Sequence, residues 1–314
     1  MITSLPKPLI VLAVAITLLV QGCGLSTHPV AASALGKPVS SAEMERLLDQ
    51  PGPIQLESIN SADWSVPLAG LVNLKSPAAI QAGLKDREEP IQVYAHVLQH
   101  PQRGNFLVDT GVSKKLLDDP GKEGLSWLLR QGMPIDKMKL QKGTADILRA
   151  LPGKLSGVFF THLHIDHITG MPDIPADVPL YIGKSESTEK HLLNLFVAGS
   201  TNQLLQGKQP LQEWAFQPDS AQQFEGVVDV FGDGSVFAIS VPGHTPGSTA
   251  YLVRTPQGPV LLTGDTCHTR WGWEHTVEPG DYTVDNARNL KSLISLKKLV
   301  ERHPKIEVRF GHQR

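Results

Sequence analysis

The stretch THLHIDH, residues 161–167, directly follows a short apolar run at residues 157–160. The apolar run predicts a buried strand. Side chains alternate along an extended segment, so His162 and His164 are expected to point to the same side. The turn that follows can bring Asp166 and His167 toward a neighbouring point. One tetrahedral ion cannot use all these ligands from so short a piece of backbone, so the stretch favours two adjacent cations.

Three further candidate ligands lie downstream, namely His244, Asp265 and His312. Each directly follows a glycine, and each comes after an apolar run that predicts a buried strand. A polar group at the end of a rigid strand is well placed for a site at a sheet edge, and glycine permits a close approach of the backbone there. Neutral imidazole and carboxylate are ligands that zinc accepts. The sequence therefore predicts a metal centre at which these side chains join those of residues 161–167.

In this order the candidate ligands resemble the metal-binding residues of the metallo-β-lactamase-fold hydrolases, and Asp109-Thr110-Gly111 after an apolar strand matches an early motif of that family. The resemblance extends over about residues 60 to 314. It implies an α/β fold, a four-layer αββα sandwich, with a dinuclear site at its edge. It also implies two Zn²⁺ ions: His162, His164 and His244 would hold one, Asp166, His167 and His312 the other, and Asp265 would bridge them together with a shared hydroxide.

The expected reaction is hydrolysis. Two divalent cations ~3.5–4 Å apart lower the pKa of a bridging water far below that of bulk water. One cation then polarises a carbonyl or phosphoryl oxygen while the second stabilises the leaving alkoxide. Asp166 is the candidate that passes the proton to the leaving group. We therefore expect attack on a lactone, ester, thioester or amide carbonyl, with no organic cofactor.

The residues around Asp265 bear on the substrate. By the resemblance, true β-lactamases commonly carry cysteine or a non-ligand in its place, whereas the lactonase, glyoxalase II and phosphodiesterase-like branches retain the carboxylate. In N-acyl homoserine lactonases a tyrosine lies three residues after this aspartate and helps to orient the substrate carbonyl; here that position is His268. His268 is expected either to contact substrate or to position other groups. An N-acyl homoserine lactonase-like function is the leading expectation.

Three alternatives remain open: a β-lactam hydrolase, a phosphodiesterase and a non-catalytic metal-binding lipoprotein of the cell envelope. The chain of 314 residues has 29 Lys and Arg against 31 Asp and Glu, a formal net charge of −2. It lacks the positive footprint that a phosphate backbone demands, which disfavours nucleic acid as a partner and weakens the phosphodiesterase alternative. The expected partner is a small-molecule substrate, and the oligomeric state is left open.

Other residues near these motifs have more ordinary expectations. Asp109 is expected to orient a ligand or to form a turn rather than to touch a metal. Cys267 is expected to be a small buried residue. Trp271 and Trp273 are expected to pack in the core, although they could also form an apolar wall for an acyl substituent.

The first residues predict an export signal. Lys7 precedes an apolar run at residues 9–20, which is shorter than the roughly 20 residues of a spanning helix, so residues 1–22 are typical of a secretory signal peptide. The ending Val20-Gln21-Gly22-Cys23 resembles the lipobox of bacterial lipoproteins and implies a lipid anchor on Cys23, with a plain cleaved signal as the alternative. Residues 23–39 are expected to be a flexible tether. These features predict an exported protein of the periplasm, attached to the outer membrane.

The remaining chain, residues 40–314, is expected to form one layered α/β domain, because predicted strands and helices alternate without a clear linker. Ser40 predicts the cap of a short helix. Strands are expected at residues 91–98, 105–111, 157–160, 179–183 and 306–310, with several more between residues 227 and 262. Further helices are expected at residues 125–131, 144–151, 185–197 and 283–302.

Overall fold

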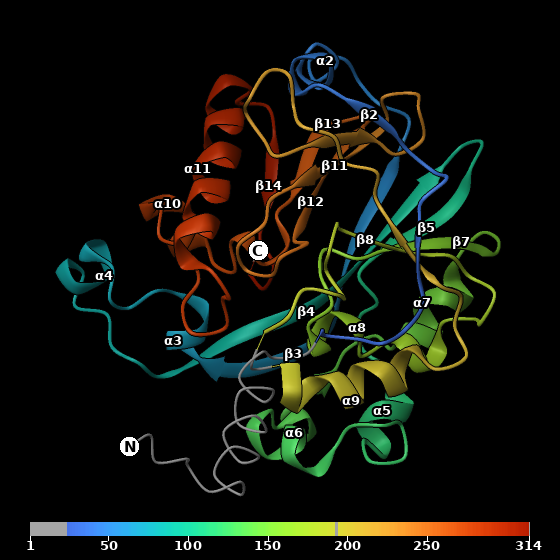
Figure 1. Cartoon of the computed structure of the whole chain (residues 1–314), viewed down its shortest axis with the longest axis vertical. Coiled ribbons are helices and arrows are strands. Elements are labelled where there is room, and N and C mark those ends of the chain that lie inside the picture. The colour runs from blue at the N-terminus through green and yellow to red at the C-terminus, as the bar shows by residue number, and fades with distance from the viewer. Residues whose placement is uncertain (1–23, 192–193, 314) are drawn as a thin grey trace, which may run out of the picture.

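The computed structural model describes residues 24–191 and 194–313. Two β-sheets pack face to face, and helices cover the outer face of each sheet (Figure 1). Apolar side chains fill the space between the sheets and the space under each layer of helices. The four-layer αββα sandwich that the resemblance implies is therefore confirmed.

The larger sheet has eight strands and the smaller sheet has six. In spatial order the larger sheet consists of β1 (Val30–Ala32), β9 (Leu211–Glu213), β8 (Leu180–Ile182), β7 (Leu155–Phe159), β5 (Gly104–Val108), β4 (Glu88–His100), β3 (Gln55–Pro67) and β6 (Lys139–Leu140). The smaller sheet consists of β14 (Glu307–Arg309), β13 (Gly258–Leu262), β12 (Thr249–Thr255), β11 (Val236–Ser240), β10 (Val227–Asp229) and β2 (Lys37–Val39).

Helices form the two outer layers. The long helix α11 (Asn286–Arg302) covers the smaller sheet, where its Leu296 and Leu299 pack in one cluster with Phe237 and Leu252. The larger sheet is covered by α5 (Lys114–Asp118), α6 (Trp127–Gly132), α7 (Thr144–Ala150), α8 (Ile165–Ile168) and α9 (Asn194–Leu205). The remaining helices are α2 (Ser41–Glu45), α3 (Leu68–Leu71), α4 (Pro77–Gln81) and α10 (Arg270–His275). Among the described residues, no helix combines the length and the apolar character needed to cross a membrane.

Phe159 anchors the core between the sheets. Its side chain is fully buried. Its ring centroid lies 5.0 to 6.0 Å from those of five other aromatic residues: Phe106, Tyr181, Trp214, Phe231 and Tyr251. Because Phe159 is the last residue of β7, this packing fixes the strand end from which the 161–167 stretch continues.

The candidate ligands lie where strands end. The strands β5, β7, β8 and β9 run parallel, so their carboxyl ends share one edge of the larger sheet. Asp109 directly follows β5 there, and residues 161–167 follow β7. In the smaller sheet, β11 and β13 point the same way because both are antiparallel to β12, and β14 is parallel to β13. His244, Asp265 and His312 follow these three strands, so both sheets send polar side chains toward one edge of the sandwich.

Two strands lie within the segment that the sequence predicts to be a flexible tether. Val30 of β1 pairs with Leu211 of β9, and Lys37 of β2 pairs with Asp229 of β10. The expectation of a tether is wrong for these strands, because their backbone groups complete open edges of the two sheets, which small and polar residues can do as well as apolar ones. The expected signal peptide, residues 1–22, and Cys23 lie outside the described residues.

Apart from the helix expected at residues 185–197, the remaining expected elements lie within a few residues of observed ones. Several observed elements are not expected, among them β3, β6, β9, α3, α4 and α5. Strand β3 is not predicted, and its pairing with β4 shifts register between Asn60 and Ala62, which breaks the alternation that reveals a strand. The helix expected at residues 185–197 is wrong: residues 185–191 contain turns, and α9 begins at Asn194. Ser185 has a φ of 63°, which a helix cannot accommodate.

A single carboxylate ties α2 to the loop after β9. Asp219 accepts hydrogen bonds from the backbone N–H and the hydroxyl of Ser41 and from the backbone N–H groups of Ala221 and Gln223. Burial would raise the pKa of Asp219, but the hydrogen bonds from Ser41 and the loop lower it below its ordinary value. Asp219 is therefore expected to stabilise the fold in its ionised form.

Replacing Asp219 with alanine should lower the free energy of unfolding at neutral pH by about 2 to 3 kcal/mol, since several charge-assisted hydrogen bonds are lost. A folded-state pKa below the unfolded one means that this contribution is complete above about pH 4 and is lost as the pH falls through the folded pKa. Thermal unfolding of wild type and variant should be measured between pH 7 and pH 3. The difference between their free energies of unfolding should become smaller toward pH 3. A constant gap would reject the ionic part of the explanation.

Candidate metal centre

Two groups of side chains meet at the shared edge of the sandwich. His162, His164 and His244 form the first group. Asp166, His167, Asp265 and His312 form the second group. Within each group the potential ligand atoms lie within 4.8 Å of one another. The structure thus brings together all seven side chains that the sequence predicts as metal ligands, divided as the resemblance implies.

The Asp265 carboxylate lies between the two groups. Its Oδ2 lies 3.7 Å from His162 Nε2 and 3.5 Å from His244 Nε2. The same oxygen lies 3.3 Å from His167 Nε2 and 3.2 Å from His312 Nε2. One oxygen within reach of both groups is the arrangement that a bridging ligand requires.

Two glycines let the ligand-bearing backbone approach closely. A Cβ on Gly311 would lie 2.2 Å from Asp265 Oδ1, so a larger residue before His312 would displace the Asp265 carboxylate. Gly243 has a φ of 143°, and a Cβ there would lie 2.2 Å from the backbone nitrogen of Asn289. The Asn289 side chain in turn accepts a hydrogen bond of 3.0 Å from the backbone N–H of His244. The Gly-His spacing of the sequence therefore has a steric cause at both places.

The donor atoms of the site fit a pair of cations. Among the described residues, the buried atoms without a hydrogen-bond partner include His162 Nε2, His167 Nε2 and Asp265 Oδ1. Leaving such atoms unsatisfied in a protein interior costs about 1 to 3 kcal/mol each. Imidazole nitrogens and carboxylate oxygens are the donors that zinc accepts, so cations between the two groups would satisfy these atoms.

The first group is neutral in the absence of a cation. Burial lowers the pKa of His162 and of His244 well below the ordinary value, and neighbouring imidazoles add to the effect. Burial also lowers the pKa of His164 to about 4, although Asp166 opposes the shift. Near neutral pH all three imidazoles are therefore in the unprotonated form that coordinates metal.

The second group carries both signs of charge. Burial alone would lower the pKa of His167, but Asp265, Asp109 and Asp166 raise it well above its ordinary value. Burial likewise opposes protonation of His312, yet Asp265 and Asp166 raise its pKa to about 10. A cation entering this group must displace these protons, so the two groups differ in how their metal affinity depends on pH.

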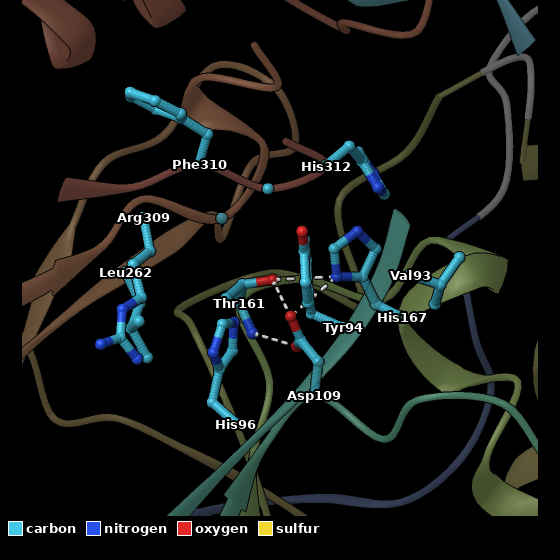
Figure 2. A pocket seen from close by; sticks show the side chains of 12 residues that line it. Val93, Tyr94, His96, Asp109, Thr161, His167, Leu262, Arg309, Phe310 and His312 are labelled. Carbon is cyan, nitrogen blue, oxygen red and sulfur yellow. Dashed lines mark hydrogen bonds and ion pairs between the residues drawn. The ribbon is translucent and has the colours of Figure 1, made fainter. Parts of the chain in front are cut away.

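Asp109 contacts one of the candidate ligands, His167, as Figure 2 shows. Its Oδ2 lies 2.8 Å from His167 Nδ1, and its carboxylate accepts hydrogen bonds from the backbone N–H and the hydroxyl of Thr161. With Nδ1 engaged, the Nε2 of His167 is left to face Asp265. Asp109 therefore orients a ligand, the role that the sequence predicts for it in preference to metal contact.

Access to the centre is uneven. Behind His167 and His312 lies a small cavity of about 10 Å³, room for about one water molecule and no substrate (Figure 2). On the other side, the Asp166 side chain is 13% exposed, whereas that of Asp265 is 4% exposed. Of the seven candidate ligands, His164 and Asp166 are the partly exposed ones, so solvent touches the centre at these two residues.

His268 lies against the Asp265 carboxylate. Its Nε2 is 2.8 Å from Asp265 Oδ2, its Nδ1 is 3.2 Å from the carbonyl oxygen of Leu71, and its side chain is 2% exposed. It also lies close enough to His244 and Asp265 to form a third group of potential ligands. Both ring nitrogens are thus engaged by the protein, which favours a positioning role for His268 over direct contact with substrate.

Glu186 is a buried carboxylate that the sequence does not single out. Its Oε1 accepts a hydrogen bond of 2.8 Å from the backbone N–H of Leu163, which lies between His162 and His164. Its Oε2 accepts hydrogen bonds from the Thr245 hydroxyl and the Gly247 N–H, at 2.7 and 2.9 Å. One side chain therefore ties the loop of His162 and His164 to the loop of His244.

Replacing Glu186 with alanine should weaken zinc binding about 10- to 100-fold, the usual effect of removing a residue that orients ligands. The loss should concentrate on the first group, because both tied loops belong to it. Zinc affinity can be measured by competition with a chromophoric chelator. The exposed Glu189 in the same segment provides the matched control, Glu189→Ala. Unchanged affinity in Glu186→Ala would show that the loops hold their positions without it.

The remaining residues near the site pack as expected. Cys267 is 1% exposed and clusters with Leu293 and Phe310, and burial raises the pKa of its thiol to about 12. Trp273 packs near Phe310, with ring centroids 5.9 Å apart. The Trp271 ring stacks on His275 in the same helix at 4.2 Å. These contacts assign the residues to packing rather than to a wall of the site.

Comparisons with known proteins show the family to which the chain belongs. The family model described as the Metallo-beta-lactamase superfamily matches residues 89–312. The N-acyl homoserine lactonase AttM of Agrobacterium fabrum is 29% identical over 219 residues, which cover 66% of this chain and 77% of that protein. AttM of Rhizobium johnstonii is 30% identical over 219 residues, with the same coverage of 66% and 77%. The crystal structure of a quorum-quenching N-acyl homoserine lactone lactonase superposes with a TM-score of 0.58 at 20% identity, covering 84% of this chain and 93% of that chain.

Proposed function

The chain belongs to the metallo-beta-lactamase superfamily and is a metal-dependent hydrolase, and from this premise we propose that it opens the ring of N-acyl homoserine lactones at a dinuclear zinc centre. The observation that carries the proposal is the Asp265 carboxylate, whose Oδ2 lies within 3.7 Å of imidazoles from both ligand groups. The two AttM relatives, whose alignments cover 66% of this chain, are N-acyl homoserine lactonases, which supports the choice of substrate.

We infer from the two groups which residues would hold each cation. His162, His164 and His244 would hold one zinc, Asp166, His167 and His312 the other, and Asp265 would bridge them. When bound, the pair supplies an activated water at neutral pH and a Lewis acid for the lactone carbonyl. The protein's own contribution is to hold these donors in place through Asp109, Glu186 and His268.

Asp166 is placed to move the proton. In the metal-free protein it is ionised near neutral pH, because the cationic His167 and His312 outweigh burial and lower its pKa to about 2. Its Oδ2 lies 3.3 Å from His312 Nε2, and its side chain is the more exposed of the two carboxylates in the centre. We assign to Asp166 the transfer of a proton from the attacking water to the ring oxygen that becomes the leaving alkoxide.

A substrate panel tests the proposal. Protein with quantified zinc should be offered N-hexanoyl homoserine lactone, a glutathione thioester, nitrocefin and bis-p-nitrophenyl phosphate. We expect kcat/KM for the lactone to exceed those of the other substrates by about two orders of magnitude, a difference of about 3 kcal/mol in transition-state binding. Preferred turnover of another member would replace the lactonase assignment. Two bound zinc ions with no turnover of any substrate would favour the non-catalytic alternative.

We also propose that the protein is exported and held at the outer membrane by a lipid on Cys23. The support is the signal-like composition of residues 1–22 and the lipobox-like ending at Cys23. Mass spectrometry of the N-terminal peptide from membrane fractions tests this directly. A Cys23→Ser variant that stays with the membrane to the same extent would reject the anchor.

A further inference from the structure

The first described residues are bound tightly to the body of the protein. The backbone N–H of Ser26 donates to the carbonyl oxygen of Ser187 at 3.0 Å. The Ser26 hydroxyl and the Thr27 N–H both donate to Asn202 Oδ1 on α9, at 2.7 and 2.8 Å. Leu25 is 6% exposed and belongs to the core under the larger sheet. The first described residue, Gly24, lies against the backbone of Ser187 and Thr188, so the body of the protein holds the chain from that residue onward.

Four large apolar side chains are exposed on α6 and α9. Trp127 and Leu128 on α6 are 67% and 50% exposed, and Leu195 and Phe196 on α9 are 47% and 52% exposed. The two helices lie side by side, and the backbone N–H at the start of α6 donates to a side chain of α9, Ser126 to Ser200, at 3.0 Å (Figure 1). We call Trp127, Leu128, Leu195 and Phe196 the α6–α9 apolar surface.

This surface lies within reach of the bilayer that would carry the anchor. Phe196 and Asn202 are six residues apart on one helix, so the surface begins about 9 Å along the helix axis from the point that fixes the chain. Leucine, phenylalanine and tryptophan are the residues that interfacial helices place in the boundary between headgroups and acyl chains. Apolar side chains gathered beside a short anchor therefore fit a lipid surface.

We propose that the α6–α9 apolar surface docks on the lipid bilayer to which Cys23 is attached, so that the protein has a fixed orientation on the membrane. The proposal rests on the lipid anchor proposed above. Helix α8, which carries Asp166 and His167, packs against α9. Docking would therefore hold the metal centre at a fixed orientation to the bilayer, with α9 between α8 and the lipid.

Site-directed spin labelling tests the orientation. The full lipidated protein, in vesicles of phosphatidylethanolamine and phosphatidylglycerol, would carry a nitroxide at Trp127→Cys or at Phe196→Cys. The control is Ile80→Cys on α4, at a residue that is 66% exposed and lies outside the surface. Cys267 is 1% exposed and should not react, and labelled wild type gives the background. The readout is the ratio of collision rates with oxygen and with a water-soluble nickel chelate.

Labels at positions 127 and 196 should show a several-fold higher oxygen-to-nickel ratio than the label at position 80. Equal ratios at all three positions in vesicle-bound protein would overturn the docking proposal while leaving the anchor intact. Spin–spin broadening without oxygen enrichment would show that a second copy of the protein covers the α6–α9 apolar surface. That result would also overturn the docking proposal. Finding Cys23 unmodified by mass spectrometry would reject the lipid anchor separately from the docking proposal. If the labels of the protein without a lipid still showed oxygen enrichment on vesicles, docking would be supported. If that protein did not bind vesicles, the anchor and the docking proposal would both be rejected.

Discussion

Replacing Asp265 with alanine is expected to lower kcat/KM for N-hexanoyl homoserine lactone by at least about a thousandfold, since one substitution removes a ligand from both cations and the electrostatic stabilisation that depends on them. The Oδ2 of Asp265 lies 3.7 Å from His162 Nε2 and 3.2 Å from His312 Nε2, so this carboxylate reaches both ligand groups. The zinc content of the purified variant should fall from two ions per chain to one or fewer.

The measurements are steady-state kinetics and metal analysis of the same preparation. Asp177→Ala, at an exposed position away from the centre, is the matched control and should retain both zinc ions and full turnover. If Asp265→Ala kept two zinc ions and near-normal turnover, the bridging role would be wrong and the lactonase proposal would lose the observation that carries it.

Replacing Asp166 with asparagine should reduce kcat about 10²- to 10³-fold with little change in KM, because the amide keeps an oxygen donor but cannot accept a proton. The zinc content should stay near two, which separates this variant from Asp265→Ala. The loss should be much smaller for the corresponding thiolactone, whose thiolate leaving group needs no protonation.

Kinetics with both substrates, together with zinc analysis, check this expectation, and Asp177→Asn is the control. Equal losses on lactone and thiolactone with one zinc missing would make Asp166 a ligand without a role in proton transfer. Undiminished turnover with both zinc ions present would remove it from the reaction altogether.

The sequence predicts the layered fold and the seven clustered side chains because each rests on a local signal. His162 and His164 directly follow an apolar strand, and Asp265 follows another with a glycine between them. The separation of the ligands into two groups is not local, and it came from the resemblance. The end of a strand fixes the position of a candidate ligand along the sheet edge. Which other ligands it lies beside depends on how the two sheets pack.

Glu186 and β3 are two features that the local sequence does not predict. Glu186 contacts Leu163 and Gly247, which are distant in sequence, and nothing in its neighbourhood separates it from a surface acid on a helix. The helix expected there does not form, because Ser185 has a φ of 63°. Strand β3 loses its alternation at the register shift after Asn60, so a pattern with a period of two residues does not reveal it.

The pairing of β1 with β9 and of β2 with β10 constrains the order in which the molecule can fold. Strand β1 can pair only after Leu211 of β9 is available, and β2 only after Asp229 of β10 is available. Contacts between residues so far apart in sequence form late and slowly, because a long loop must close first. A chain that crosses a membrane amino end first would therefore expose two unpaired sheet edges until most of it has emerged, and that interval is when it would most need protection from aggregation.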